Sequence, residues 1–196
     1  MTEQQDSSIS RADREQKNGH RAAVIWLTGL SGAGKSTIAR DVERRLFERG
    51  SRTAVLDGDR LRDGLCSDLG FSPADRTENI RRAGEMARIL FEQGCIVLCA
   101  FVSPYRQDRE RVRARFLEGS YLEVFVKATL ETCRMRDPKG LYARAGQGQI
   151  TQFTGLSAPY EEPLDPDVTL DTERLTVEET GLLLITRLQS AGVIGK

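Results

Sequence analysis

A glycine-rich stretch, GLSGAGKST, occupies residues 29–37 and contains the residue types best suited to bind phosphate. Gly29, Gly34, Lys35 and Ser36 follow the order glycine, four residues, Gly-Lys-Ser, which is the pattern of a nucleotide-binding phosphate loop. Glycines let backbone N–H groups converge on an anion, the lysine reaches the β- and γ-phosphates, and the serine hydroxyl ligates Mg²⁺. The stretch predicts a site for ATP and Mg²⁺; the alternative is a glycine-rich turn with a chance lysine.

A phosphate loop needs an acid at the end of a neighbouring strand, either to hold the Mg²⁺ shell or to activate the acceptor. Asp57 and Asp59 meet this need in the sequence LDGD, at the end of an apolar run. We expect Asp57 to contact Mg²⁺ through water and Asp59 to accept the proton of an acceptor hydroxyl. The next apolar run leads into SPY and offers only Ser103 instead of an acid. The alternative role of either aspartate is to cap the following helix.

A second group of residues suits an anionic, aromatic acceptor. Arg62 and Arg76 offer planar, bidentate hydrogen bonding to phosphate or sulfate-like oxygens. Asn79 follows Arg76 by three residues on a predicted helix, so both side chains can face one site. Phe71 and Phe153 could stack on a nucleobase. Each of these residues taken alone would be interpreted as a surface arginine or a core phenylalanine.

Apolar runs typical of buried strands alternate with helical patterns along the chain. The expected strands are 24–28, 53–57, 95–102, 121–126 and 167–171, and the expected helices are 11–17 (capped by Ser10), 37–49, 77–93, 105–117, 130–135 and 176–190. This alternation predicts a three-layer α/β domain with a mostly parallel central sheet. Ligands of such domains gather at the carboxyl ends of the strands, where the glycine-rich stretch and the LDGD acids are expected.

One long segment, residues 137–166, interrupts the alternation. It holds many glycines and prolines and has little apolar periodicity. A connection of this length in a compact domain is usually functional or disordered. Its basic residue Lys139 and its aromatic residues Tyr142, Phe153 and Tyr160 favour a mobile lid that closes over the site. We call residues 137–166 the lid segment.

Composition limits the classes of function. The 196 residues include 29 Lys and Arg and 29 Asp and Glu, so the formal net charge is zero, which argues against nucleic-acid binding. Arginines at 109, 111, 113 and 115 lie among acids and are expected on a solvated helix face. No apolar run is long enough to span a bilayer, so we expect no membrane partner.

The first twenty residues are polar and carry several acids, which indicates neither a secretory signal nor a transit peptide. We expect residues 1–9 to form a disordered tail and residues 10–196 to form one domain. The four cysteines, at 66, 95, 99 and 133, lie in or beside apolar stretches without zinc spacing. Reduced, buried thiols in a cytoplasmic protein are the simplest interpretation.

Several longer motifs occur in a fixed order. They are GLSGAGKST, LDGD with RLRDGL, DLGFS with ADR and ENIRR, SPYRQDR, RDPKGLY, and FTG followed by PYEEP. Together they closely resemble the adenylylsulfate kinase (APS kinase) family, from about Ser10 to the C-terminus. The resemblance implies a P-loop kinase fold and MgATP-dependent phosphorylation of the 3′-hydroxyl of adenosine 5′-phosphosulfate (APS), a step of sulfate assimilation. It also implies a homodimer.

The resemblance assigns roles residue by residue. It implies that ATP is bound by Gly29, Leu30, Ser31, Gly32, Ala33, Gly34, Lys35, Ser36 and Thr37, and that Asp59 and Lys35 are catalytic. It implies that the acceptor is bound by Arg62, Phe71, Arg76, Asn79, Val102, Ser103, Lys139 and Phe153, with the two phenylalanines on either side of its adenine. Ser103 matches a serine reported as a phosphoserine intermediate in some members, whereas direct transfer from ATP needs no covalent step.

The chain departs from the family pattern at a few positions. Arg60 replaces a common Asn, Lys127 replaces a usual Asp, and Leu156-Ser157-Ala158 replaces Ile-Asp-Asp. None of these changes removes a loop, base or stacking residue. Two alternatives are a P-loop kinase for another small acceptor, such as a nucleoside monophosphate or a sugar acid, and a catalytically silent ATP-sensing module.

Overall fold

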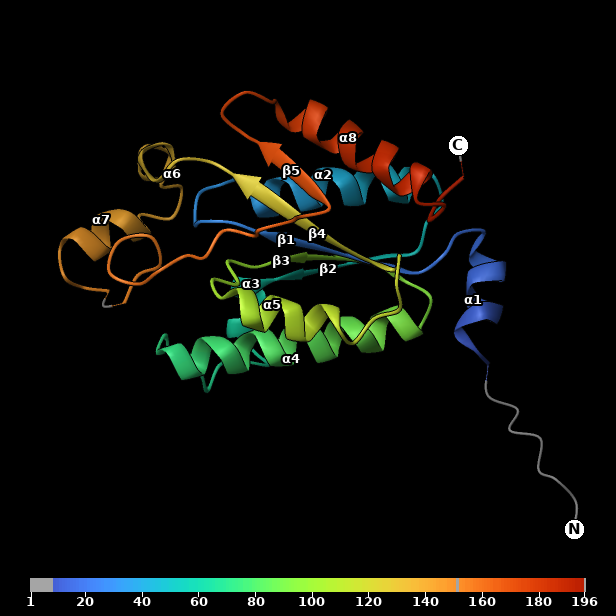
Figure 1. Cartoon of the computed structure of the whole chain (residues 1–196), viewed down its shortest axis with the longest axis horizontal. Helices are drawn as coiled ribbons and strands as arrows, with labels where there is room; N and C mark the ends of the chain where they lie inside the picture. The colour runs from blue at the N-terminus through green and yellow to red at the C-terminus, as the bar shows by residue number, and fades with distance from the viewer. Residues whose placement is uncertain (1–8, 151, 196) are drawn as a thin grey trace, which may run out of the picture.

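The computed structural model describes residues 9–150 and 152–195. The prediction of a disordered tail over residues 1–9 falls almost entirely outside the described residues. A five-stranded parallel sheet forms the centre of the molecule, with the strand order β2-β3-β1-β4-β5 (Figure 1). Its strands are β1 (Ala23–Thr28), β2 (Thr53–Asp57), β3 (Ile96–Ala100), β4 (Tyr121–Lys127) and β5 (Val168–Asp171). The predicted α/β fold with a parallel sheet is confirmed.

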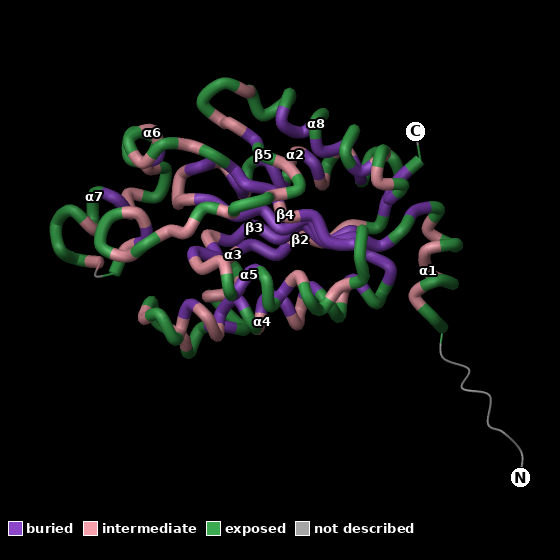
Figure 2. The backbone as a smooth tube through the Cα atoms, in the orientation of Figure 1, coloured by how far each residue is buried: buried purple, intermediate pink, exposed green. Residues whose placement is uncertain are grey.

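Helices cover both faces of this sheet, which explains why its central strands are continuously apolar. Helices α2 (Lys35–Glu48) and α8 (Val177–Ser190) pack on one face, and α4 (Pro73–Glu92) and α5 (Arg106–Arg113) pack on the other (Figure 1). Because side chains alternate along a strand, Ile25 joins the core beneath α2 and α8, while Trp26 joins the core beneath α4. Figure 2 shows this buried sheet between two partly exposed helical layers.

Local capping signals set where several helices begin. Helix α1 (Arg11–Asn18) starts after Ser10, whose side chain and that of Asp13 form a capping box, as the sequence predicts. Helix α4 begins at Pro73, four residues before its predicted start, because Ser72 caps it and proline is favoured in a first helical turn. Helix α5 ends at Arg113 rather than at 117.

Three short helices lie near the carboxyl ends of the strands. Helix α6 (Leu130–Arg136) agrees with its prediction, whereas α3 (Gly58–Arg62) and α7 (Leu141–Gly146) were not predicted. Helices of five or six residues contain too few turns to produce a clear apolar period. The lid segment is therefore more regular than its sequence indicates, because it contains α7 and a bridge between Thr154 and Ala158.

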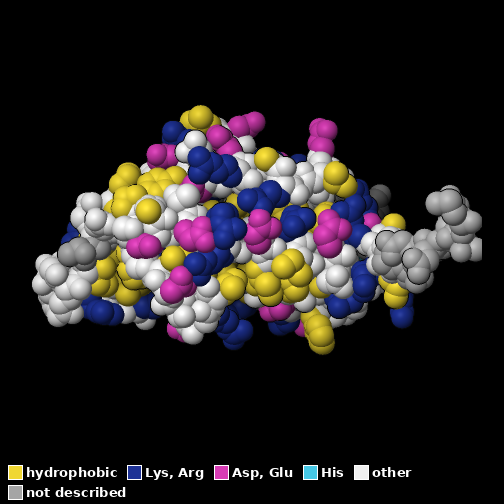
Figure 3. All heavy atoms as spheres, turned by 90° about the horizontal axis from the view of Figure 1, so that it is seen from below, with side chains coloured by type: hydrophobic (Ala, Val, Ile, Leu, Met, Phe, Trp, Pro, Cys, Tyr) yellow, Lys and Arg dark blue, Asp and Glu magenta, His cyan; other side chains and the backbone are white. Residues whose placement is uncertain are grey.

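Charged side chains of both signs are interspersed on the face that carries α4 and α5 (Figure 3). Among the described residues, no helix is long and apolar enough to cross a membrane.

Candidate active site

A large cleft lies at the carboxyl ends of the strands. Its volume is about 1150 Å³, and its walls come from the glycine-rich loop, α3, α4, the loop after β3, the lid segment and residues 172–180. The cleft gathers most of the predicted site residues: Ser31, Gly32, Ala33, Gly34, Lys35, Ser36, Thr37, Asp57, Asp59, Arg62, Phe71, Arg76, Asn79, Val102, Ser103, Lys139 and Phe153. Gly29 and Leu30 lie behind this wall rather than in it. The sequence thus predicts most of the residues of one continuous site.

The glycine-rich loop connects β1 to α2 in the manner of a phosphate loop. At Gly29, φ is 152°, and an added Cβ would lie 2.4 Å from the carbonyl oxygen of Val126. At Gly32, φ is 80°, and an added Cβ would lie 2.9 Å from the carbonyl oxygen of Cys133. Only glycine fits both positions, because a side chain would clash with fixed backbone. The loop therefore holds its shape against β4 and α6 and leads directly into the first turn of α2.

Lys35 is the first residue of α2, and its ammonium group turns back onto the loop. Its Nζ donates to the carbonyl oxygens of Gly29 at 2.9 Å and Leu30 at 2.7 Å. Burial of the ammonium lowers the pKa of Lys35 to about 8. A phosphate in the loop would supply the negative charge that this buried cation lacks.

Ser36 and Asp57 meet beside the loop. The Ser36 hydroxyl donates to Oδ2 of Asp57 at 2.6 Å, while Oδ1 of Asp57 accepts from the backbone N–H of Asp59 at 3.0 Å and caps α3. Burial opposes the charge on Asp57, but the hydrogen bonds from Ser36 and Asp59, together with the nearby charges of Lys139 and Arg40, hold the pKa of Asp57 below its usual value. A hydroxyl beside an ionised carboxylate is a suitable donor set for a hard cation such as Mg²⁺.

Asp59 has a different environment from Asp57. Its side chain does not cap the helix; it lines the cleft, is largely exposed, and forms an ion pair with Lys139 of the lid segment. The alternative role of capping therefore applies to Asp57 and not to Asp59. Because Asp59 is accessible within the cleft, an acceptor hydroxyl can approach its carboxylate.

The predicted acceptor residues gather on the opposite wall. Phe71 is 51% exposed, and the Arg62 guanidinium lies 4.3 Å from its ring centre. Arg76 donates to the backbone carbonyls of Phe71, at 3.0 Å, and of Gln152 in the lid segment. Asn79 is buried, and its Oδ1 has no hydrogen-bond partner among the described residues. The wall thus presents an exposed ring, two guanidinium groups and an unsatisfied amide oxygen.

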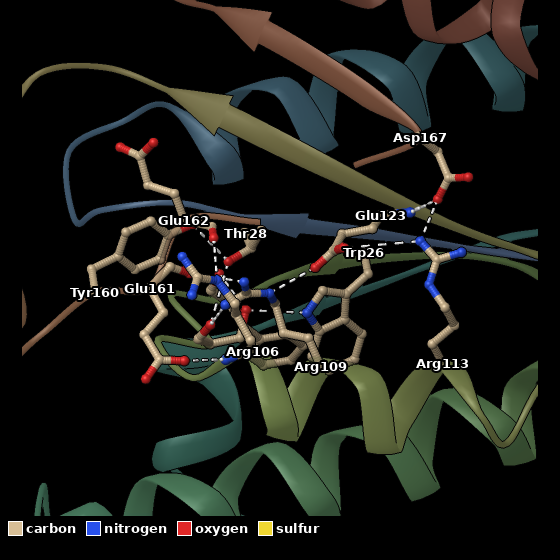
Figure 4. A network of polar contacts seen from close by, with 12 residues as sticks. Trp26, Thr28, Arg106, Arg109, Arg113, Glu123, Tyr160, Glu161, Glu162 and Asp167 are labelled. Carbon is tan, nitrogen blue, oxygen red and sulfur yellow. Dashed lines mark hydrogen bonds and ion pairs between the residues drawn. The ribbon is translucent and has the colours of Figure 1, made fainter. Parts of the chain in front are cut away.

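Ser103 lies at the floor of the cleft in a constrained backbone. It is 1% exposed, its φ is 37°, and its Oγ accepts from the indole N–H of Trp26 at 3.1 Å. A hydrogen-bonded network surrounds it (Figure 4). Thr28 on β1 donates to the carbonyl of Val102 at 2.8 Å and shares a 3.0 Å hydrogen bond with the hydroxyl of Tyr160.

Arg109 is the centre of this network (Figure 4). It is only 2% exposed, so the expectation of a solvated helix face is wrong at this position. Its guanidinium donates to Glu123 on β4 at 2.6 Å, to the carbonyl of Ser103 at 2.7 Å and to the carbonyl of Glu161 at 2.8 Å. The one sequence signal for burial is that Arg109 precedes the buried Val112 by three residues and so shares its helix face.

One further wall of the cleft consists of residues that the sequence did not predict. Arg136 on α6 donates to the hydroxyl of Thr172 at 2.9 Å and to its carbonyl at 2.7 Å, and the Thr172 hydroxyl donates to the carbonyl of Ala33 at 3.1 Å. Leu175 and Val177 extend this wall toward α8. The available signal was that Thr172 directly follows the last expected strand, at the edge where ligands bind.

Comparisons with known proteins agree with this geometry. A family model described as adenylylsulphate kinase matches residues 21–171. The chain is 54% identical over 178 residues to an adenylyl-sulfate kinase of Geotalea uraniireducens, covering 91% of this chain and 86% of that protein. It is similar in structure to the APS kinase of Mycobacterium tuberculosis in complex with AMPPNP and APS, with a TM-score of 0.83, 45% identity, and coverage of 87% and 99% of the two chains. It is also similar to a hexameric APS kinase from Thiobacillus denitrificans, with a TM-score of 0.68, 31% identity, and coverage of 93% and 32%.

Proposed function

Because this chain belongs to the adenylylsulfate kinase family, we propose that its cleft binds ATP and APS together and transfers the γ-phosphoryl group to the 3′-hydroxyl of APS. The products are ADP and 3′-phosphoadenosine 5′-phosphosulfate, in sulfate assimilation. One observation supports this function most strongly: a single cleft joins a phosphate loop to a wall of arginines and an exposed aromatic ring. A nucleotide triphosphate fits the first part, and a sulfated nucleotide fits the second.

On the nucleotide side, the phosphates of ATP take the place of the loop carbonyls as partners of Lys35. The loop N–H groups and the start of α2 favour negative charge, because unpaired donors and the helix dipole point toward the site. Arg136 and Thr172 lie at the far end of the same wall, where the base and ribose of ATP would rest. We therefore assign residues 29–37 to phosphate binding and the 172–177 wall to the nucleoside.

On the acceptor side, Arg62 and Arg76 would bind the phosphosulfate oxygens, and Asn79 would bond a sugar or base group through its free Oδ1. Phe71 and Phe153 would hold the adenine between them. The exposure of Phe71 supports this role, because a core residue would be covered. Lys139 would leave Asp59 and contact substrate when both substrates are bound.

Asp59 would act as the general base. Its carboxylate would accept the proton of the 3′-hydroxyl as the oxygen attacks the γ-phosphorus in line with the leaving ADP. We favour direct transfer over a phosphoserine intermediate, because the hydroxyl of Ser103 is buried and already accepts from Trp26. Ser103 and Val102 would instead shape the floor of the acceptor site.

Mg²⁺ would bind beside the phosphate loop, held by the Ser36 hydroxyl and, through a water molecule, by Asp57. When bound, it neutralises charge on the β- and γ-phosphates. Among the described residues, no group of three or more His, Cys, Asp or Glu side chains could hold a metal by itself. This fits a cation that takes most of its ligands from substrate phosphates and water.

We also propose a homodimer in the cytoplasm. The four cysteines are all free and buried, which fits a reducing compartment. Light scattering after size exclusion would measure the assembly, and a monomer or a hexamer would overturn the dimer.

The function is tested by incubating the purified chain with MgATP and APS and identifying the product by mass. The expected product is APS with one added phosphoryl group, with the 3′ position fixed by phosphorus NMR. Lys35→Ala should lose on the order of 10²-fold or more in kcat, since the lysine charge stabilises the transferred phosphoryl group. Parallel reactions with a nucleoside monophosphate and a sugar acid test the other kinase specificities, and ATP binding without turnover of any acceptor would indicate a silent ATP-sensing module.

A further inference from the structure

Tyr142 on α7 joins the lid segment to the phosphate loop. Its side chain is almost fully enclosed, at 5% exposure, although α7 is short and the neighbouring residues of the lid segment are largely exposed. Its hydroxyl donates to the carbonyl oxygen of Ser31 at 2.9 Å. Ser31 belongs to the loop that would enclose the ATP phosphates, so this bond connects the lid segment directly to the nucleotide site.

The ring of Tyr142 makes a second contact, with the acceptor site. Its centre lies 4.8 Å from that of Phe153, and the two rings meet edge to face at 80°. The turn that carries Phe153 also lies close to the loop, since a Cβ added at Gly155 would lie 3.0 Å from the side chain of Leu30. Tyr142 therefore contacts the phosphate loop with its hydroxyl and the expected adenine-stacking ring with its own ring.

The hydroxyl contact has a consequence for phosphate binding. In a trans peptide the C=O and the next N–H point in opposite directions. Fixing the carbonyl of Ser31 toward Tyr142 therefore fixes the N–H of Gly32 in the opposite direction, within the same peptide plane. Gly32 lines the cleft, and its N–H is among the loop donors available to phosphate.

We propose that Tyr142 is a positioning residue that links the phosphate loop to Phe153, so that ATP and APS binding affect each other through this side chain. The inference rests on the proposed role of Phe153 in stacking on the APS adenine. An edge-to-face ring pair fixes the orientation of Phe153, and the hydroxyl bond fixes the ring pair to the loop. A change in the loop on nucleotide binding would thus alter the position of the stacking ring. APS would then bind with different affinity in the presence and absence of nucleotide, which is what coupling between the two sites means.

The direct test is Tyr142→Phe, which removes the hydroxyl and keeps the ring. The loss of one hydrogen bond should weaken APS binding about 2- to 12-fold by calorimetric titration. Tyr121→Phe is the matched control, because Tyr121 is also buried and its hydroxyl has no hydrogen-bond partner among the described residues. The control should bind APS as the wild type does; an equal loss in both variants would mean that any buried hydroxyl change has this effect and would overturn the proposal.

A double-mutant cycle separates positioning from a merely structural role. If Tyr142 acts through Phe153, then Tyr142→Phe should cause no further loss of APS affinity in a Phe153→Ala background. Fully additive losses would show that Tyr142 acts independently of Phe153 and would overturn the proposal. If Phe153→Ala alone leaves APS affinity unchanged, the proposed stacking role fails first, and that failure is distinguishable from a failure of Tyr142.

The link to the nucleotide site has its own measurement. APS affinity is measured with and without MgAMPPNP, and the ratio of the two dissociation constants gives the coupling between the sites. We expect a ratio different from one in the wild type and closer to one in Tyr142→Phe, with Tyr121→Phe unchanged. A wild-type ratio of one, or a ratio that Tyr142→Phe does not alter, would contradict the proposal.

Discussion

The ammonium of Lys35 would exchange its present partners for phosphates when a nucleotide binds, and this exchange would couple proton binding to nucleotide binding. Without a nucleotide it donates to the carbonyls of Gly29 and Leu30, and burial lowers its pKa to about 8. Carbonyl groups are neutral and compensate the buried charge only in part. ATP phosphates are anionic and would raise the pKa of Lys35 again.

We therefore predict proton uptake on nucleotide binding. At pH 7 the free Lys35 is already mostly protonated, whereas at pH 9 it is mostly neutral and must gain a proton as the phosphates enter. Calorimetric titrations with MgAMPPNP in buffers of different ionisation enthalpy measure the number of protons taken up. More protons should be taken up at pH 9 than at pH 7. Lys35→Arg should abolish the difference, because arginine stays charged throughout this range. Equal uptake at both pH values in the wild type would contradict the assignment.

Asp59 and Asp57 are two residues apart and have different partners, which supports the separate roles proposed for them. Asp57 is occupied by Ser36 and by the cap of α3, while the side chain of Asp59 pairs with the exposed Lys139. The amide in Asp59→Asn keeps the shape of the side chain but cannot accept a proton. We expect kcat to fall by ~10²–10⁴-fold, with ATP affinity nearly unchanged.

Steady-state kinetics with an ATP-analogue titration measures both quantities for Asp59→Asn. Asp165→Asn, an exposed aspartate that does not line the cleft, is the control and should retain full activity. A collapse of ATP affinity in Asp59→Asn would instead place Asp59 in the Mg²⁺ shell.

At the scale of elements, the two rings that are proposed to stack on the adenine come from different parts of the fold. Phe71 lies just before the Ser72 cap of α4, and Phe153 lies in the lid segment. Arg76 bonds the backbone of Phe71 and that of Gln152, which precedes Phe153. One guanidinium therefore connects the beginning of α4 to the lid segment beside both rings.

Truncation of either ring should weaken APS binding much more than ATP binding. Base–aromatic stacking is worth roughly 1–3 kcal/mol per ring, so Phe71→Ala and Phe153→Ala should each cost about 5- to 150-fold in APS affinity. Phe153→Ala should also lower kcat, because the lid segment would close without its ring. Phe47→Ala on α2, another exposed phenylalanine, is the control. Equal losses for both ligands would rule out the stacking role.

At the scale of the whole molecule, Arg109 connects three segments that are distant in sequence. It bonds β4 through Glu123, the cleft floor through Ser103, and the end of the lid segment through Glu161. The backbone N–H of Glu161 also donates to the carbonyl of Pro104 at 2.8 Å. The end of the lid segment is thus fixed to the cleft floor, and the network in Figure 4 is part of the framework of the active site.

Loss of this network should destabilise the fold as a whole. Arg109→Ala removes the close cation of the nearly buried Glu123 and leaves it with the more distant Arg113, at 3.9 Å. Removing one partner of a buried ion pair costs about 3–5 kcal/mol. Urea unfolding should show this loss, with a smaller one for Arg109→Lys, whose ammonium cannot reproduce three planar contacts. Arg44→Ala, which breaks only exposed ion pairs on α2, should leave the midpoint almost unchanged. An equally small change in the urea midpoint of Arg109→Ala would show that the network is not important for stability.

The features that could be predicted from the sequence are those that depend on local chemistry. The phosphate loop follows from the spacing of Gly29, Gly34, Lys35 and Ser36, and the parallel sheet follows from apolar runs that alternate with helical patterns. The cap at Ser10 could also be predicted, because a capping box involves residues only three positions apart. Residues of the acceptor wall were identified by type and by family motif, but their contacts were not.

Contacts between residues far apart along the chain depend on the folded arrangement of the elements and could not be predicted from local sequence. Arg109 and Arg111 are both arginines beside Glu110, yet Arg109 is the buried one. It is buried because β4 presents a carboxylate to it and the end of the lid segment presents a carbonyl. Tyr142 contacts Ser31 although 111 residues separate them. Long-range contacts of this kind arise from the strand order, which brings the loops after β1, β3 and β4 to one edge of the sheet. Local sequence encodes no such order, because it is set by the packing of both helical layers against the sheet.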